Sequence, residues 1–284
     1  MYPILDATGW RSVIQPRPSG RLEKELLIDP AGDVYIFKWP EKPGEAWAEK
    51  LAGELGHLFD LEMAEVELAI RENPTTLQRR GTLSRHFRYR KGQEVTGRWE
   101  PGVDLLQEML PGYDGMSQYS YQRVRAILEP LGILLDFHRM LVFDAVICNI
   151  DRHDENWEVF ERRRLTPIFD NGRIELAFLT PKKQLGLLGD AESRHKLYME
   201  SRPALRWEPE VGDFYDPHQF GFLEVLRQEH PDEFAMAVEP FLRVSAEAMD
   251  HCVDELPDGF IPPPCRRLAK VMLRERMEQL EALV

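Results

Sequence analysis

The stretch that decides the fold is NIDRHDEN, residues 149–156, which is followed closely by PIFDNG, residues 167–172. The first segment comes directly after LLDFHRMLVFDAVIC (134–148), a strongly apolar run that is predicted to be helical. A short hairpin over 161–169 is predicted between the two segments. The functional prediction depends mainly on the polar side chains that these two segments carry.

Phosphoryl transfer needs few protein groups. A carboxylate orients the attacking hydroxyl and accepts its proton, while an amide and a second carboxylate hold Mg²⁺ on the nucleotide phosphates. Asp151 and Asn156 have the D-x-x-x-x-N spacing of the first two groups in protein kinases, and Asp170 begins a D-N-G turn where the second carboxylate belongs. Gly172 allows the chain to turn sharply after that ligand. Each element is common alone, but together they predict an ATP- and Mg²⁺-dependent phosphotransferase.

Both motifs resemble those of the HipA-like kinases, bacterial serine/threonine kinases named for a persistence toxin. The D-R-H-x-x-N string is also similar to that of phosphoinositide 3- and 4-kinases, distant members of the same superfamily. The resemblance implies that Asp151 is the catalytic base, that Asn156 and Asp170 are Mg²⁺ ligands, and that His153 positions the catalytic loop. The resemblance extends over residues 17–260 in the order of the predicted elements. The motif residues that are specific to it lie around 149–172.

The N-terminal part offers the remaining groups of a kinase site. Residues 26–38 predict a hairpin with its turn at PAGD, and residues 46–59 predict a helix. Lys38 ends the second strand in a pattern similar to V-A-I-K, so it is expected to grip the nucleotide phosphates. Glu49 is the expected helix partner of Lys38, with Glu45 as the rival. A solvated lysine at a strand end is the alternative reading of Lys38.

Two further segments are assigned nucleotide contacts. Ser19 and Gly20 lie in a Pro- and Gly-containing loop before the first strand, where backbone N–H groups could cradle phosphate. The resemblance also implies that Ser19 is a regulatory phosphorylation site. Residues 104–110 predict an apolar strand that serves as the hinge between lobes, with Glu108 and Met109 pairing with the adenine edge. A plain loop is the alternative reading of the segment with Ser19 and Gly20, and an interior strand is the alternative reading of residues 104–110.

The order of elements predicts an α+β, two-lobed protein-kinase-like fold. Residues 1–110 form a β-rich N-lobe with one helix, and residues 111–284 form a mainly helical C-lobe. A helix pair over 121–148 is expected to break near Pro130. The chain is expected to be a compact form without the additional N-terminal subdomain of many relatives. Residues 173–205, the activation segment, begin with Arg173 where many relatives carry small hydroxyl residues, so acceptor choice stays open.

Composition narrows the class of protein. The formal charge of −13 argues against a broad nucleic-acid-binding face. Three distant cysteines predict neither a disulfide framework nor a zinc site. The N-terminus has no signal-peptide pattern, and no apolar run reaches the ~20 residues of a membrane span. A cytoplasmic protein is therefore expected.

The leading hypothesis is a HipA-like serine/threonine kinase that phosphorylates a Ser/Thr residue of a protein substrate. The kinase's own chain is a second candidate substrate, and an antitoxin or other regulatory protein is a candidate partner. A lipid or small-molecule kinase of the same fold is the first alternative. A catalytically weak nucleotide-binding toxin or partner module is the second. Metal-dependent hydrolysis by Asp151, His153 and Asp154 is the third, although no further His-rich motif completes such a site.

Overall fold

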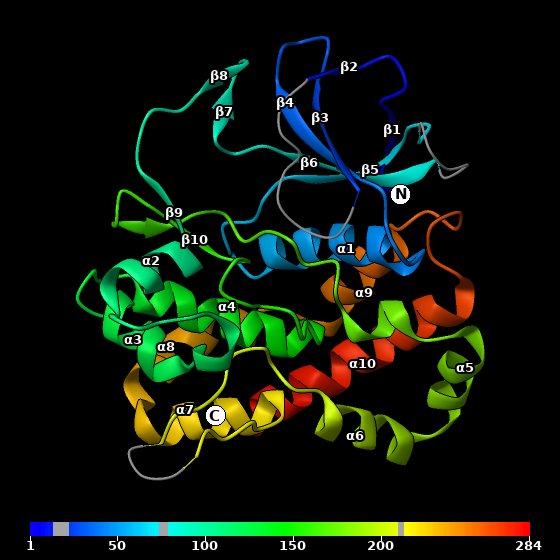
Figure 1. The fold of residues 1–284 in the computed structure, drawn as a ribbon. Coiled ribbons are helices and arrows are strands. Elements are labelled where there is room, and N and C mark those ends of the chain that lie inside the picture. Colours follow the sequence, from blue (N-terminus) through cyan, green and yellow to red (C-terminus); the bar gives the residue numbers. More distant parts are fainter. Residues whose placement is uncertain (14–22, 74–78, 210–212) are drawn as a thin grey trace.

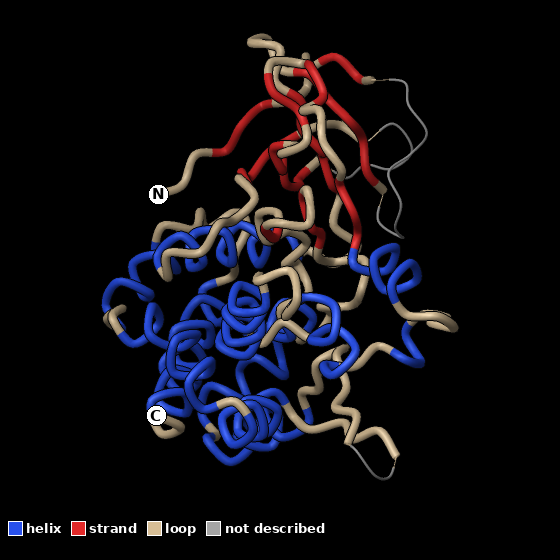
Figure 2. The backbone as a smooth tube through the Cα atoms, turned by 90° about the vertical axis from the view of Figure 1, so that its left-hand side faces the viewer, coloured by secondary structure: helices blue, strands red, loops and turns tan. Residues whose placement is uncertain are grey.

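A sheet and a set of helices form two parts of the molecule, with the sheet at the top of Figure 1 and the helices below it. Figure 2, turned by 90°, shows the same separation of strands and helices. The computed structural model describes residues 1–13, 23–73, 79–209 and 213–284. The predicted α+β arrangement of a β-rich N-lobe and a helical C-lobe is confirmed, whereas the division at residue 110 stays a prediction.

The N-lobe sheet, within the described ranges, has six strands in the order β1-β5-β6-β4-β3-β2. Strands β1 and β5 are parallel, and the other neighbours are antiparallel. In this order β4 lies inside the sheet, between β6 and β3. The last residue of β4 therefore has a neighbouring strand on each side. The strands are β1 (Ile4–Asp6), β2 (Arg11–Ser12), β3 (Lys24–Ile28), β4 (Val34–Lys38), β5 (Val66–Ile70) and β6 (Arg80–Arg85).

The hairpin of β3 and β4 agrees with the prediction for residues 26–38. Its turn is stabilised by the Asp29 carboxylate, whose Oδ1 accepts a hydrogen bond from the backbone N–H of Asp33 at 2.8 Å. Gly32 has a φ of 91°, a left-handed conformation that glycine adopts without strain. This turn sets the register in which Lys38 lies opposite Lys24 at the open end of the hairpin.

Helix α1 (Gly44–Leu58) lies beneath the sheet and contacts both β5 and β6 (Figure 1). Its other side contacts helix α9 (Ala246–Asp254) and the 3-10 helix η2 (Glu175–Phe178) of the C-lobe. At its C-terminal end, Phe59 packs on Phe241 with ring centroids 4.6 Å apart. The predicted helix is thus confirmed, and it is wedged between the lobes.

The C-lobe is built around helix α4 (Leu134–Ile147), which is almost entirely buried. Helix α3 (Tyr121–Leu128) precedes it, and the break predicted near Pro130 is present, with Gly132 at a φ of 72°. The helix ends at Cys148, which adopts a left-handed conformation with a φ of 57° and so turns the chain into the 149–156 loop. The remaining helices are α5 (Pro181–Gly189), α6 (Ala191–Glu200), α7 (Gln219–Glu229), α8 (Pro231–Leu242) and α10 (Pro263–Glu281), with the 3-10 helix η1 (Met116–Gln118) before α3.

The segment predicted as a hinge strand, 104–110, is instead helix α2 (Gly102–Met109). Leu105, Leu106 and Met109 face the core at the i, i+1, i+4 spacing of a helix, so the apolar run was assigned the wrong period. The strand before α2 is β9 (Trp99–Pro101), which pairs with β10 (Glu158–Phe160), and β10 pairs in turn with β11 (Arg164–Leu165). Residues 83–95 include the end of β6 and the small hairpin of β7 (Tyr89–Arg90) and β8 (Gln93–Glu94).

In the part of the chain that the structure describes, no helix has both the length and the apolar character needed to cross a bilayer.

The buried helices belong to one large core that joins α1, α4 and the C-terminal helices. A smaller core, which includes Leu27, Phe37 and Leu83, packs in the sheet. Each fully buried Phe or Leu side chain contributes about 1.5–3 kcal/mol relative to an exposed one.

His138 on α4 is completely buried, as expected for a core histidine. Its Nε2 lies 2.9 Å from the Tyr121 hydroxyl, and its Nδ1 has no hydrogen-bond partner among the described residues. Burial, together with the nearby His230 and Arg125, lowers the pKa of His138 from 6.5 to about 4. The folded protein therefore holds this imidazole neutral at a pH where the unfolded chain protonates it.

The pH dependence of stability follows from this lowered pKa. Above pH 6.5 both states carry a neutral His138, and between pH 6.5 and 4 the unfolded state binds the extra proton, so stability falls as the pH falls. We expect His138→Gln to remove on the order of 2–3 kcal/mol of the acid-induced loss in unfolding free energy. Urea unfolding of both proteins at pH 7.5 and pH 4.5 measures this difference, and equal losses in the two proteins would contradict it.

Candidate active site

Lys38, Glu49 and Asp170 meet at the junction of the two lobes. The Lys38 Nζ lies 2.7 Å from Glu49 Oε1 and 3.1 Å from Asp170 Oδ1. Glu49 Oε2 also accepts a hydrogen bond from the Thr82 hydroxyl of β6 at 3.1 Å. The structure therefore pairs Lys38 with Glu49 and not with Glu45, which accepts backbone N–H groups before α1 instead.

The electrostatics of this cluster keep its members charged. Burial of the Asp170 carboxyl raises its pKa, but the Lys38 and Lys24 ammonium groups outweigh burial and hold the pKa of Asp170 well below its ordinary value. Burial also lowers the pKa of Lys38, but Asp170 and Glu49 outweigh it and raise the pKa of Lys38 above its ordinary value. Lys24 Nζ lies 3.6 Å from Asp170 Oδ2. At neutral pH Asp170 is an ionised carboxylate.

The 149–156 loop is closed on itself by hydrogen bonds. The Asn156 Nδ2 donates to the backbone oxygen of Asp151 at 2.7 Å, and the Asp151 N–H donates to Asn149 Oδ1 at 3.3 Å. The side chain of Asp151 remains partly exposed, whereas Asn156 is buried. The loop thus presents the Asp151 carboxylate at the surface and fixes the Asn156 amide behind it.

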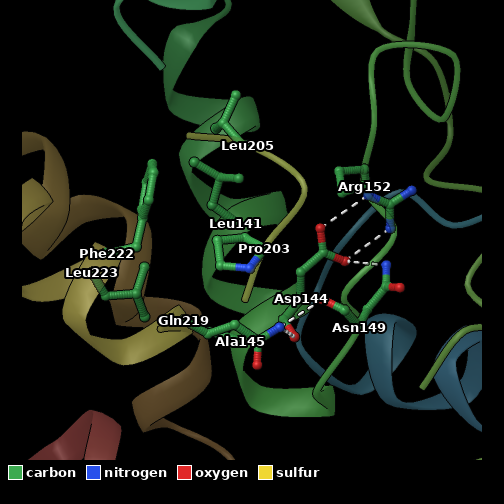
Figure 3. A pocket seen from close by; sticks show the side chains of 10 residues that line it. All are labelled: Leu141, Asp144, Ala145, Asn149, Arg152, Pro203, Leu205, Gln219, Phe222 and Leu223. Carbon is green, nitrogen blue, oxygen red and sulfur yellow. Dashed lines mark hydrogen bonds and ion pairs between the residues drawn. The ribbon is translucent and has the colours of Figure 1, made fainter. Parts of the chain in front are cut away.

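Arg152 joins this loop to the 167–172 segment. Its guanidinium donates to both carboxylate oxygens of Asp144, each at 2.9 Å, a bidentate pair visible in Figure 3. The Nη1 atom also donates to the backbone oxygens of Asn156 and Phe169, both at 2.8 Å. Because Arg152 is 2% exposed, it acts as a buried clamp that brings Asn156 and Asp170 to one place.

Backbone pairing reinforces the clamp. Asn149 forms an isolated bridge with Ile174, and the Glu175 N–H donates to the Cys148 oxygen at 3.1 Å. Gln219 of α7 donates to the backbone oxygens of Asp144 and Asn149, as Figure 3 shows. A small cavity, of about 20 Å³, lies beneath these contacts and is lined by Leu141, Asp144, Ala145, Asn149, Arg152, Pro203, Leu205, Gln219, Phe222 and Leu223.

Neither Arg152 nor Asp144 was identified as a site residue from the sequence. Arg152 lies inside the recognised motif, but its hydrogen bonds extend to the C-terminal end of α4 and to the 167–172 segment. The spacing of residues along the chain therefore did not indicate these partners. Asp144 is an isolated carboxylate in an apolar helix, and an isolated buried carboxylate normally has a charged partner. That rule is the one signal by which the sequence could have indicated that Asp144 has a charged partner.

The segment predicted to be the hinge strand is a helix, and the pairing of Glu108 and Met109 with the adenine edge stays a prediction. Glu108 lies on α2, where its exposed carboxylate pairs with Arg98 and, at 2.7 Å, with Arg162. Met109 packs against the core from the same helix. The chain instead leaves the N-lobe sheet at the end of β6, and the ring of Phe87, just after that strand, lies 5.7 Å from the ring of Phe169. Ser19 and Gly20 lie outside the described residues.

The alternative of a hydrolytic metal site does not fit the geometry. Asp154 is buried and its Oδ2 accepts a hydrogen bond from the Tyr113 hydroxyl at 2.6 Å, so this carboxylate faces the interior. The His153 Nδ1 accepts the Glu155 backbone N–H at 3.2 Å, which agrees with a role in shaping the loop. Across the four described ranges, no group of three or more His, Cys, Asp or Glu side chains is arranged to hold a metal.

Comparison with solved structures places this geometry among known folds. A crystal structure of a proinflammatory kinase of Helicobacter pylori, CtkA, superimposes with a TM-score of 0.80 over 99% of this chain and 97% of that one, at 18% identity. The chain has the protein-kinase-like fold. A structure of the toxin–antitoxin system HipA, HipB and its operator DNA from Shewanella oneidensis MR-1 shares it with a TM-score of 0.59 and 12% identity, over 89% of this chain and 60% of that chain.

The kinase-like fold explains why the two motifs recognised in the sequence meet. Neither a family model nor a curated protein matches this sequence, so the likeness is one of structure. The resemblance to HipA-like kinases, stated from the motifs, agrees with both structural neighbours. In this fold the Lys38–Glu49 pair joins the sheet to α1, and Asp170 joins that pair to the C-lobe.

Proposed function

We propose that the protein is an ATP- and Mg²⁺-dependent phosphotransferase, specifically a HipA-like serine/threonine kinase that acts on a protein. The observation that carries the proposal is the ion-paired cluster of Lys38, Glu49 and Asp170. Arg152 clamps this cluster to the loop that bears Asp151 and Asn156. Five predicted site residues from distant parts of the chain, Lys38, Glu49, Asp151, Asn156 and Asp170, are thereby joined in one centre.

The chemistry of the proposed transfer assigns a role to each group. The acceptor hydroxyl oxygen forms a bond to the γ-phosphorus of ATP while the bond from that phosphorus to the bridging oxygen breaks and its electron pair leaves with ADP. The partly exposed Asp151 carboxylate orients the hydroxyl and accepts its proton. Lys38 would hold the nucleotide phosphates by charge. Since the Asp151 carboxylate is partly exposed at the surface of the loop, a side chain of a protein substrate can reach it.

The residues present fit a magnesium ion. Asp170 is an ionised carboxylate, and the hydrogen bond made by the Asn156 Nδ2 leaves its Oδ1 as a neutral oxygen ligand. Mg²⁺ prefers such hard oxygen ligands and completes its shell with water and substrate phosphates, so two protein ligands suffice. When bound, the ion would neutralise charge on the phosphates.

The proposal of a protein acceptor extends to a partner protein. The Shewanella structure contains HipA together with HipB, and an antitoxin or other regulatory protein is the corresponding expectation for this chain. To test the acceptor class, the purified protein is incubated with γ-labelled ATP, Mg²⁺ and a cell lysate, and the label is scored in protein and in the organic phase. We expect label in protein. Label that partitions into the organic phase would identify a lipid kinase of the same fold.

A further inference from the structure

Arg173 contacts the proposed base and has no role in the site described so far. Its Nε lies 3.3 Å from Asp151 Oδ2, and its guanidinium carbon lies 5.1 Å from the centroid of the Phe178 ring. The side chain is 50% exposed, so the guanidinium has donors that face solvent. Among the described residues, Arg173 is the cation that forms an ion pair with Asp151.

The backbone on both sides of Arg173 is fixed. Gly172 lies against α1, where an added Cβ would be in van der Waals contact with the backbone oxygen of Glu45 at 3.5 Å. Ile174 forms the bridge to Asn149 at the start of the catalytic loop. Arg173 therefore extends from the segment that carries the proposed metal ligand toward the loop that carries the proposed base.

Two other cations near the reacting groups, Arg152 and Lys38, already have partners, and Lys24 faces Asp170 with its Nζ 3.6 Å from Oδ2. Arg152 is buried and bonded to Asp144 and to backbone oxygens, and Lys38 is buried between Glu49 and Asp170. His153 turns its Nδ1 to the loop backbone. In phosphoryl transfer the charge spreads over the three equatorial oxygens of the transferred group, and a cation that contacts them stabilises the transition state. Arg173 has the position and the exposed donors for that contact.

We propose that Arg173 is a further catalytic residue, which contacts the γ-phosphoryl group while that group passes from ADP to the acceptor oxygen. The inference rests on the proposed function. A base and the hydroxyl it serves lie about 3 Å apart, and the attacked phosphorus lies about 3–3.5 Å beyond the hydroxyl oxygen. A guanidinium 3.3 Å from the base carboxylate reaches that phosphoryl group by rotation of its side chain.

A binding measurement tests this contact without an acceptor. Calorimetry measures the affinity for ADP with Mg²⁺, first alone and then with aluminium fluoride, which mimics the planar phosphoryl group in transfer. For Arg173→Met we expect roughly 10- to 100-fold weaker binding of the aluminium fluoride complex, the usual effect of losing a charge-assisted hydrogen bond. The affinity for ADP with Mg²⁺ alone should stay within about twofold, and Arg173→Lys should retain part of the effect.

Arg164 provides a matched control. It is 47% exposed, forms an ion pair with Glu62 at 3.1 Å and lies 5.3 Å from the Phe160 ring, so it reproduces the surroundings of Arg173 away from Asp151. Arg164→Met should bind both complexes as the wild type does. Retained or tighter binding of the aluminium fluoride complex by Arg173→Met, or an equal loss for ADP alone, would overturn the role of Arg173. A wild-type protein that binds no nucleotide would overturn the proposed function itself, and the inference with it.

Discussion

Asp151→Asn is expected to lower the rate of γ-phosphate transfer by roughly 10²- to 10⁴-fold, the usual contribution of a positioned general base. The hydrogen bonds that shape the loop use the backbone N–H and oxygen of Asp151, and its carboxylate has the exposed Arg173 as its ion-pair partner among the described residues. The fold and the nucleotide affinity should therefore persist. Single-turnover transfer from γ-labelled ATP to the acceptor that the lysate experiment identifies measures the rate. Thermal unfolding of the variant checks that the fold persists.

A control for Asp151→Asn comes from the same loop. Glu155 is exposed and its carboxylate lies 4.0 Å from His153 Nδ1, a distance at which an exposed pair contributes little. Glu155→Gln should transfer phosphate at the wild-type rate. Transfer by Asp151→Asn at the rate of Glu155→Gln would contradict the assignment of Asp151 as the base.

Asp144→Ala is expected to lower the free energy of unfolding by about 3–5 kcal/mol, the cost of leaving one partner of a buried ion pair without the other. Two hydrogen bonds from the Arg152 guanidinium end on the Asp144 carboxylate, and the Asn149 Nδ2 donates to the same carboxylate at 2.8 Å. Removing this acceptor leaves a buried charge unpaired where the 149–156 loop meets the 167–172 segment. Urea unfolding measures the loss as a shift of the midpoint at an unchanged slope.

Asp136 on the same helix is the matched control. Its side chain is exposed and lies 3.5 Å from Arg139, so Asp136→Ala should change the free energy of unfolding by no more than about 0.5 kcal/mol. The double variant Asp144→Ala/Arg152→Met, which removes both buried charges, should recover part of the loss. A loss for Asp144→Ala no larger than that for Asp136→Ala would show that the clamp does not stabilise the protein.

Residues whose positions depend on local pattern were predictable from the sequence. Lys38 comes directly after four residues of the second strand of a hairpin that is recognisable in the sequence. Glu49 lies on the buried face of the helix that follows. The spacing of Asp151, Asn156 and Asp170 needs no tertiary knowledge, because it is set by one loop and one turn. The structure then supplies the ion pairs of Lys38 with Glu49 and Asp170.

Residues whose roles depend on distant partners were not predictable. Arg152 bonds to atoms that lie 8 residues before it and 17 residues after it, and no spacing rule connects these positions. Helix α2 was misread because Leu105 and Leu106 are adjacent apolar residues, which fit a buried strand as well as a helix in so short a run. Arg173 was noted as a departure from relatives, but its contact with Asp151 appears only in three dimensions.

The central claim is that Asp170 lies in a centre that binds ATP with Mg²⁺, and calorimetric titration with ATP tests it most directly. Wild-type protein and Asp170→Asn are each titrated with ATP in Mg²⁺ and in EDTA. We predict that the wild type binds ATP more tightly in Mg²⁺ than in EDTA, because the ionised Asp170 carboxylate helps to hold the ion. Asp170→Asn should lose that difference while it unfolds cooperatively. Equal Mg²⁺ dependence in the two proteins, or no binding of ATP by the wild type, would contradict the claim.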